Sequence, residues 1–172
     1  MKKYFYSILG IIILSASSCD FTPETNYQPD IFFLQKPISN NDDTLSIYNT
    51  FEANTLSLDT LHVGDTVSFF MYLEGYTNNL TEFYLKLSAD SAAGILLPNK
   101  ASLDSIFLST SNYNQGKFLF DLSSTELYFP FKYIAKKASL DAKLTFTVIS
   151  DANFEYNQNY IILETPILTT TE

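Results

Sequence analysis

Hydrophobic and polar side chains alternate along much of the chain after residue 54. The apolar residues occupy every second position in four segments, at residues 67–73, 83–87, 118–122 and 144–148. A period of two residues is typical of a β-strand that buries one of its faces. The pattern therefore predicts strands at these four places.

Turn-forming residues separate the alternating segments. Residues 63–65, 75–79 and 112–116 are rich in Gly, Asn and Asp, which favour turns. About seven to nine short strands separated by such turns favour an all-β fold, an immunoglobulin-like antiparallel β-sandwich. Residues 103–108 predict either one helical turn or a further strand, because periodicity does not separate the two over so short a segment.

One predicted strand contains a proline. Residues 125–133 read TELYFPFKY, so that Leu127, Phe129 and Phe131 face one side while Tyr128 faces the other. Since proline has no backbone N–H to donate to a neighbouring strand, we expect Pro130 at a sheet edge or a bulge.

The chain divides into three parts in this interpretation. Residues 1–18 form a signal peptide, because Lys2 and Lys3 precede an apolar run at residues 4–14 and small residues follow it. That run is too short to cross a bilayer, which needs roughly 20 apolar residues. Residues 19–53 predict a tether with an early strand at 31–34 that docks on the domain, and residues 54–172 predict the sandwich domain.

The only cysteine follows the apolar run directly. Residues 17–19 read Ser-Ser-Cys, which resembles the lipobox of bacterial lipoproteins in the relaxed form of the Bacteroidetes. The resemblance implies that Cys19 becomes the acylated first residue of the mature chain. It also implies a lipid-anchored protein of the outer membrane that faces the periplasm or the cell surface. More than one acyl chain is needed for lasting anchoring, and a lipoprotein cysteine carries several.

Two further stretches resemble a known class of domain. Residues 56–75 (LSLDTLHVGDTVSFFMYLEG) and 138–152 (ASLDAKLTFTVISDA) look like strands of the immunoglobulin-like domains found in Bacteroidetes lipoproteins of unknown function. The resemblance implies the fold and brings no activity with it.

Composition excludes some classes of partner. The formal net charge is −9 and the chain has no arginine, whereas nucleic acid binding needs clustered Lys and Arg. We therefore expect no nucleic acid partner. The 15 Phe and 12 Tyr residues supply large apolar areas for a sheet core.

No catalytic residue, metal ligand or cofactor is predicted. His62 is the only histidine, no nucleophile elbow accompanies it, and we interpret it as a surface residue. The oxygen-rich run at residues 40–43 lacks the spacing of an EF-hand and is interpreted as a solvated loop. Glu74, Glu82 and Glu126 are the carboxylates considered for glycosidase chemistry, but alternating strands place such residues outward, and we expect no enzyme.

Two tyrosines are candidate ligand-binding residues. Tyr113 lies in a turn among amide side chains, and Tyr128 lies on the outward side of its strand. Exposed tyrosines can stack on a sugar or anchor a protein partner. The alternative is that these rings belong to the core and its rim.

A short motif recurs through the chain. Five triplets consist of Asp, then Ser or Thr, then an aliphatic or small residue, and they place candidate hydroxyls at Thr44, Thr60, Thr66, Ser91 and Ser105. The triplet is similar to the acceptor site of the general O-glycosylation system of Bacteroidetes exported proteins. Ordinary turn chemistry is the alternative explanation.

These observations lead to one expected function and one alternative. We expect a lipid-anchored lipoprotein of the cell envelope that acts as a non-enzymatic binding, adhesion or scaffolding module. The alternative is a carbohydrate-binding accessory lipoprotein of a glycan-uptake system. The expected partners are the membrane, through lipid on Cys19, and either a protein or a glycan.

Overall fold

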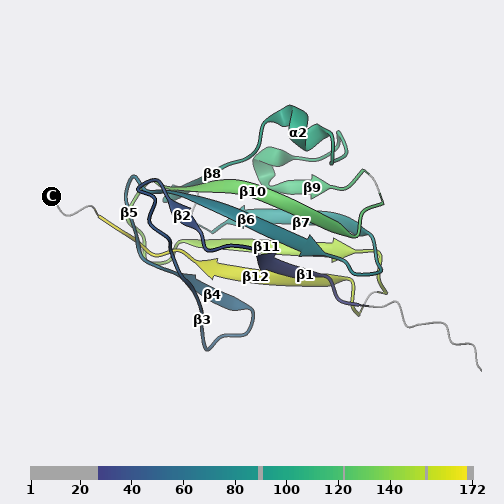
Figure 1. Cartoon of the computed structure of the whole chain (residues 1–172), viewed down its shortest axis with the longest axis horizontal. Helices are drawn as coiled ribbons and strands as arrows, with labels where there is room; N and C mark the ends of the chain where they lie inside the picture. Colours follow the sequence, from purple (N-terminus) through teal and green to yellow (C-terminus); the bar gives the residue numbers. More distant parts are fainter. Residues whose placement is uncertain (1–26, 89–90, 122, 154, 170–172) are drawn as a thin grey trace, which may run out of the picture.

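The computed structural model describes residues 27–88, 91–121, 123–153 and 155–169 (Figure 1). Cys19 and the predicted signal peptide lie outside these residues. The strands run close to the long axis of the molecule, while helix α2 lies above them and the β3–β4 hairpin below them in the view of Figure 1. The described residues contain no helix that is long and apolar enough to cross a membrane.

The first sheet, sheet A, is antiparallel. Its strands in spatial order are β1 (Asp30–Phe33), β6 (Thr66–Glu74), β10 (Glu126–Ala135) and β8 (Ala93–Leu96). A short strand, β2 (Ile38–Ser39), pairs with β6 beyond the end of β1. The long strands β6 and β10 therefore form the centre of the sheet.

The second sheet, sheet B, is mainly antiparallel. Its strands in spatial order are β3 (Ile47–Asn49), β4 (Thr55–Leu58), β12 (Gln158–Glu164), β11 (Lys143–Ser150), β7 (Leu80–Leu87) and β9 (Lys117–Leu119). Only the pair of β4 and β12 is parallel. Two further short strands, β5 (Leu61–His62) and β13 (Ile167–Leu168), form a small parallel sheet.

The strand order is that of an immunoglobulin-like sandwich. The chain passes from sheet A to sheet B between β6 and β7, and again between β10 and β11. The orders β1-β6-β10-β8 and β12-β11-β7 correspond to the A-B-E-D and G-F-C sheets of that fold. The fold class expected from the sequence is confirmed, with thirteen strands in the described residues instead of seven to nine. The additional strands are only two to four residues long, too short to show an alternation.

The sandwich starts earlier in the chain than the expected boundary at residue 54. The early strand is present as β1, which pairs with β6 through the register Ile31 to Leu73. Strands β2 and β3 follow it in the same segment and pair with β6 and β4. Residues 30–49 therefore contribute three strands to the domain.

Pro130 lies at a place where β10 has a neighbour on one side only. It is opposite Phe70 in β6, whereas β8 pairs with β10 only from Lys132 onward. The carbonyl of Phe70 accepts a hydrogen bond from Leu34 N, so its backbone groups point away from β10. In an antiparallel pair, the backbone groups of Pro130 then point away from β6. The missing N–H thus falls on the unpaired side of β10, as at an edge.

Two short helical segments lie in the connection between β8 and β9, which are edge strands of sheet A and sheet B. Helix α2 (Lys100–Asp104) is a single helical turn capped by the side chain of Asn99, which accepts from Ser102 N. It includes only residues 103 and 104 of the segment 103–108, so this segment as a whole is neither the expected helical turn nor the expected strand. Phe107 follows the helix as an isolated bridge to Phe120. The 3-10 helix η1 (Tyr113–Gln115) begins shortly after.

The core lies between the sheets and is dominated by phenylalanine rings. Phe129 is close to Phe83, Phe107 and Phe118, with ring centroids 5.3, 6.3 and 5.2 Å away. A second group joins the sheets through Phe33, which contacts Phe69 and Phe146 at 5.9 and 5.7 Å. Such tilted and edge-to-face arrangements are the ones that aromatic rings prefer.

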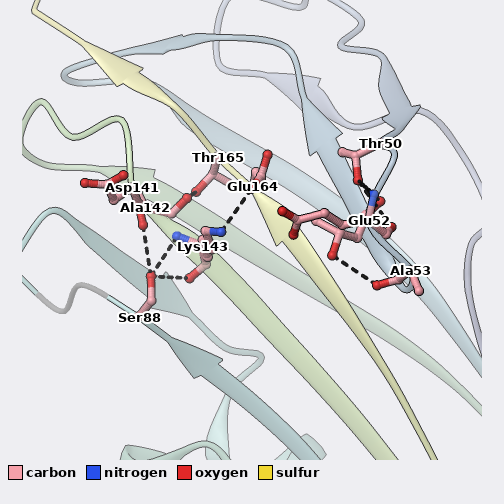
Figure 2. Close-up of polar contacts among 10 residues, drawn as sticks. Thr50, Glu52, Ala53, Ser88, Asp141, Ala142, Lys143, Glu164 and Thr165 are labelled. Atoms are coloured by element: carbon pink, nitrogen blue, oxygen red, sulfur yellow. Dashed lines mark hydrogen bonds and ion pairs between the residues drawn. The ribbon is translucent and has the colours of Figure 1, made fainter.

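One buried polar chain crosses this core. Thr165 donates from Oγ1 to the carbonyl of Ala142 at 3.1 Å, so the buried hydroxyl of Tyr133 donates to Thr165 Oγ1 at 2.8 Å. Figure 2 shows Thr165 beside Ala142, with the ion pair of Lys143 and Glu164 next to them. This series of hydrogen bonds links β10 to the start of β11 and the end of β12.

Candidate functional site

The outer face of sheet A carries three aromatic rings on adjacent strands. Phe32 in β1, Tyr72 in β6 and Tyr128 in β10 are register partners. The ring centroids of Phe32 and Tyr72 are 6.2 Å apart, and those of Tyr72 and Tyr128 are 4.9 Å apart. Phe32 is 41% exposed and Tyr128 is 53% exposed. These three residues are called the aromatic row below.

The apolar surface extends along the strands beyond this row. Phe70 is 6.1 Å from Tyr128, and their ring planes differ by only 24°. Leu34, which is exposed, follows β1 and donates its backbone N–H to Phe70 O. Contiguous exposed apolar surfaces mark interaction sites more often than isolated exposed residues do. The outer face of sheet A is therefore a candidate binding surface.

The next row on the same face is acidic. Asp30, Glu74 and Glu126 are register partners on the same three strands. Like charges directly opposite one another on a sheet oppose folding. These carboxylates, called the acidic row below, therefore repel one another across the three strands.

One hydrogen bond connects the two rows, and a second joins the acidic row to Tyr76. The hydroxyl of Tyr72 donates to Glu126 Oε2 at 2.8 Å, and that of Tyr76 donates to Asp30 Oδ2 at 2.6 Å. Each bond to a carboxylate, together with burial and nearby negative charge, raises the pKa of its phenol to about 12. Both phenols are therefore protonated hydrogen-bond donors at neutral pH.

No described ion pair neutralises the acidic row. The ion pairs in the described ranges join Lys100 to Asp104, Lys117 to Glu82, and Lys143 to Glu164. Lys132 is on the same face in β10, but its register partner in β6 is Ser68. It therefore lies three rows from Glu126.

Tyr113 and Tyr128 are not brought together. Tyr113 is half-buried in η1, where its ring packs against Phe107 and Phe118 at 6.4 and 5.6 Å. Its hydroxyl donates to Asp104 at 3.0 Å, and burial, followed by this bond, raises its pKa. Of the two candidate tyrosines, only Tyr128 lies on an open sheet face.

Tyr113 also lines a groove. The groove has a volume of about 620 Å³ and lies among β7, β8 and η1, where Leu85, Leu87 and Ile95 form part of its wall. Its other contributors include Lys86 and the turn at residues 114–116. Because core contacts fix the Tyr113 ring, the ring forms part of the groove wall instead of an exposed stacking surface.

The carboxylates considered for catalysis fall on different sheets. Glu74 and Glu126 are cross-strand neighbours on the outer face of sheet A, whereas Glu82 lies in sheet B and accepts from Tyr84 OH. His62 is exposed in β5, and its backbone N–H donates to Asp65. The described residues contain no group of three His, Cys, Asp or Glu side chains suited to holding a metal.

The candidate O-glycosylation residues differ in exposure. Thr44, Thr60, Ser91 and Ser105 are exposed. Thr66, at the start of β6, is less accessible because it is half-buried, and its backbone N–H donates to Asn40 Oδ1. Thr44, Thr60, Ser91 and Ser105 are thus the sites that an enzyme could reach most readily.

The sequence alone did not single out Phe32, Tyr72 or Asp30, and it named Glu74 and Glu126 without pairing them. Their outward direction follows from alternation in β1 and β6, where the neighbours Ile31 and Met71 are buried. Their assembly depends on the order β1-β6-β10 and on the register, which joins residues up to ninety-six positions apart, from Asp30 to Glu126. Alternation could have named the outward rings, but not their alignment.

Comparison with known proteins gives no family. No family model and no curated protein matches the chain. Among solved structures, the ASH/PapD-like domain of human CEP192 (PapD-like domain 7) aligns at 8% identity over 89% of this chain and 94% of that chain, with a TM-score of 0.41. Domains 4 and 5 of the S-layer protein SbsC align at 12% identity over 76% of this chain and 46% of that chain, with a TM-score of 0.32. At these scores the function rests on the chain's own residues.

Proposed function

We propose that this chain is a lipid-anchored, non-enzymatic binding module of the cell envelope that holds its partner against the outer face of sheet A. The observation that carries the proposal is the aromatic row. Tyrosine is among the residues that dominate binding energy at interfaces, and the row presents Tyr72 and Tyr128 beside Phe32 on one rigid sheet.

The rigidity of this face supports binding. Each ring of the aromatic row alternates with a buried residue of the same strand, such as Ile31, Met71 and Phe129. The backbone beneath the rings is therefore fixed by the core, and little conformational freedom is lost when a partner is bound.

The lipid anchor is supported by the signal-like start of the chain and by the position of Cys19. The test is the intact mass of the full-length chain purified from the membrane fraction of a bacterial host. The wild type should carry acyl chains, and Cys19→Ser should lack them and leave the membrane. A wild-type chain that is cleaved but unlipidated contradicts the anchor.

The binding face is tested by photo-crosslinking in intact cells. A crosslinking amino acid placed at Tyr128 should form defined adducts. The matched control is Tyr160, which is 41% exposed but lies in β12 of sheet B. Equal labelling at the two positions, or no adduct at Tyr128, contradicts the proposed face.

Carbohydrate binding is the second candidate function. The observation in its favour is the nearly parallel pair of Phe70 and Tyr128, whose planes differ by 24°, with Glu126 nearby as an acceptor for hydroxyl groups. Such a pair can stack on the apolar face of a sugar ring. A glycan array probed with the wild type and with Tyr128→Ala tests it: binding that the substitution abolishes supports this candidate, and no binding to any glycan contradicts it.

A further inference from the structure

The outer face of sheet A combines two features that attract cations. Aromatic rings carry negative potential on their faces, and a cation above a ring is attracted to it by this potential. The acidic row lies one row away from the aromatic row on all three strands. A cation placed between the rows would therefore interact with a ring and a carboxylate at once.

The chain contains an internal example of this arrangement on its other sheet. In β7, the hydroxyl of Tyr84 donates to Glu82. Lys117 of β9 interacts with both side chains, since its Nζ lies 5.6 Å from the Tyr84 ring centroid and 3.6 Å from Glu82 Oε2. Lys86 also approaches the same ring, at 5.1 Å. In sheet B, lysine thus binds to the tyrosine–glutamate pair.

A similar pair in sheet A, which joins β6 to β10, has no described cation. Tyr72 donates to Glu126 as Tyr84 does to Glu82. The described cation–π contacts both involve Tyr84, and none of the described ion pairs includes the acidic row. A tyrosine–glutamate pair that binds lysine on one sheet is therefore open to a cation from outside on the other.

We infer that the partner of this face is a protein segment that presents lysine or arginine side chains, with a cation held over Tyr72 and Tyr128 and beside Glu74 and Glu126. The inference rests on the proposed binding function. It follows from charge complementarity, because the cation relieves the repulsion within the acidic row. A neutral sugar could stack on the rings but would leave this repulsion in place.

The size of the face also favours an extended partner over a single small cation. The carboxylates are spread over three strands, and the aromatic row with Phe70 and Leu34 adds apolar surface beside them. The aliphatic stems of lysine and arginine can cover such surface while their charged ends reach the carboxylates. A segment with several basic side chains matches both parts of the face.

The first experiment identifies what is crosslinked from Tyr128 in cells that express the full chain. The expected adduct is a protein segment, mapped by mass spectrometry, with Lys or Arg at the contact. An adduct with a glycan, with a second copy of this chain, or with a segment that lacks Lys and Arg overturns the inference while the binding face stands. No adduct at Tyr128 refutes the proposed function as well.

A second experiment measures the affinity of the purified mature chain for a synthetic peptide that alternates lysine with leucine. Its control peptide has glutamine in place of each lysine. The double variant Glu74→Gln/Glu126→Gln should lower the affinity for the basic peptide by about tenfold or more. Asp141→Asn/Glu155→Gln removes the same charge at exposed positions outside the face and should change it far less. Equal losses in the two double variants, or equal affinity for the two peptides, overturn the inference.

Discussion

Tyr128 and Phe129 are neighbours in β10. Replacing Phe129 by alanine should mainly lower stability, whereas replacing Tyr128 by alanine should mainly abolish binding. Phe129 is 2% exposed and Tyr128 is 53% exposed. Successive side chains of a strand point to opposite faces, so a register shifted by one residue would exchange them. The pair therefore tests both the two-sided architecture of sheet A and the binding role of its outer face.

The cost of Phe129→Ala follows from its ring contacts. Its ring packs edge-to-face against Phe83, Phe107 and Phe118, with interplanar angles of 70°, 73° and 73°. Removing a buried phenylalanine ring costs about 3 to 5 kcal/mol, because apolar burial is lost and a cavity is left. In a domain of this size, that change lowers Tm by roughly 6 to 20 °C.

Tyr128→Ala should cost much less. Its ring contacts Tyr72 and Phe70 on an open surface, and cross-strand pairs of this kind contribute roughly 0.2 to 1 kcal/mol each. Urea unfolding followed by circular dichroism gives both free energies, and crosslinking or peptide binding gives the functional effect. The expected result is a stable Tyr128→Ala protein that no longer binds. An equal loss of stability in the two variants would refute the two-faced arrangement of β10.

Three further predictions concern the fold and its pH dependence. Tyr133→Phe removes the donor in the buried hydroxyl chain and should lower the free energy of unfolding by about 1 kcal/mol, as urea unfolding would measure. Gly116→Ala should cost about 2 to 5 kcal/mol, because the residue has φ +63° and its new Cβ would lie 1.9 Å from Leu85 O. Gly64→Ala meets no atom within 4 Å and should cost less, and urea unfolding of both variants measures the difference. The pKa of Tyr72 is raised from 10.0 to about 12 in the folded protein. The contribution of this shift to stability is therefore full below pH 10 and is lost as the pH rises towards 12. Over this pH range, the free energy of unfolding should fall less steeply for Tyr72→Phe than for the wild type.

The sequence predicts the strands of the core because their alternation is long. The segments at 67–73, 83–87 and 144–148 fall within β6, β7 and β11, and each has a buried face whose period is visible without any partner. Strands β2, β5 and β13 have two residues each. They form only because neighbouring strands offer hydrogen bonds, which is information that a local pattern does not contain.

The candidate site was predicted only in part for a related reason. Tyr128 was recognisable because alternation places it outward, and Tyr113 looked equivalent because it lies in a polar turn. The structure separates them, since the Tyr113 ring packs on Phe107 and Phe118. Whether a turn tyrosine folds back on the core depends on the tertiary fold, as does the register that aligns Tyr128 with Tyr72 and Phe32.

Strand β1 completes both the aromatic row and the acidic row. It contributes Phe32 to the first and Asp30 to the second, while Ile31 is buried and the Phe33 ring contacts Phe146 of the opposite sheet. Asp30 is held further by Asn159 of β12, whose Nδ2 donates to it at 3.0 Å. The proposed binding face therefore depends on the docking of β1, the first strand of the described residues. Because the contacts of β1 with both sheets hold Phe32 and Asp30 in place, these contacts determine whether the face stays assembled while a partner is bound.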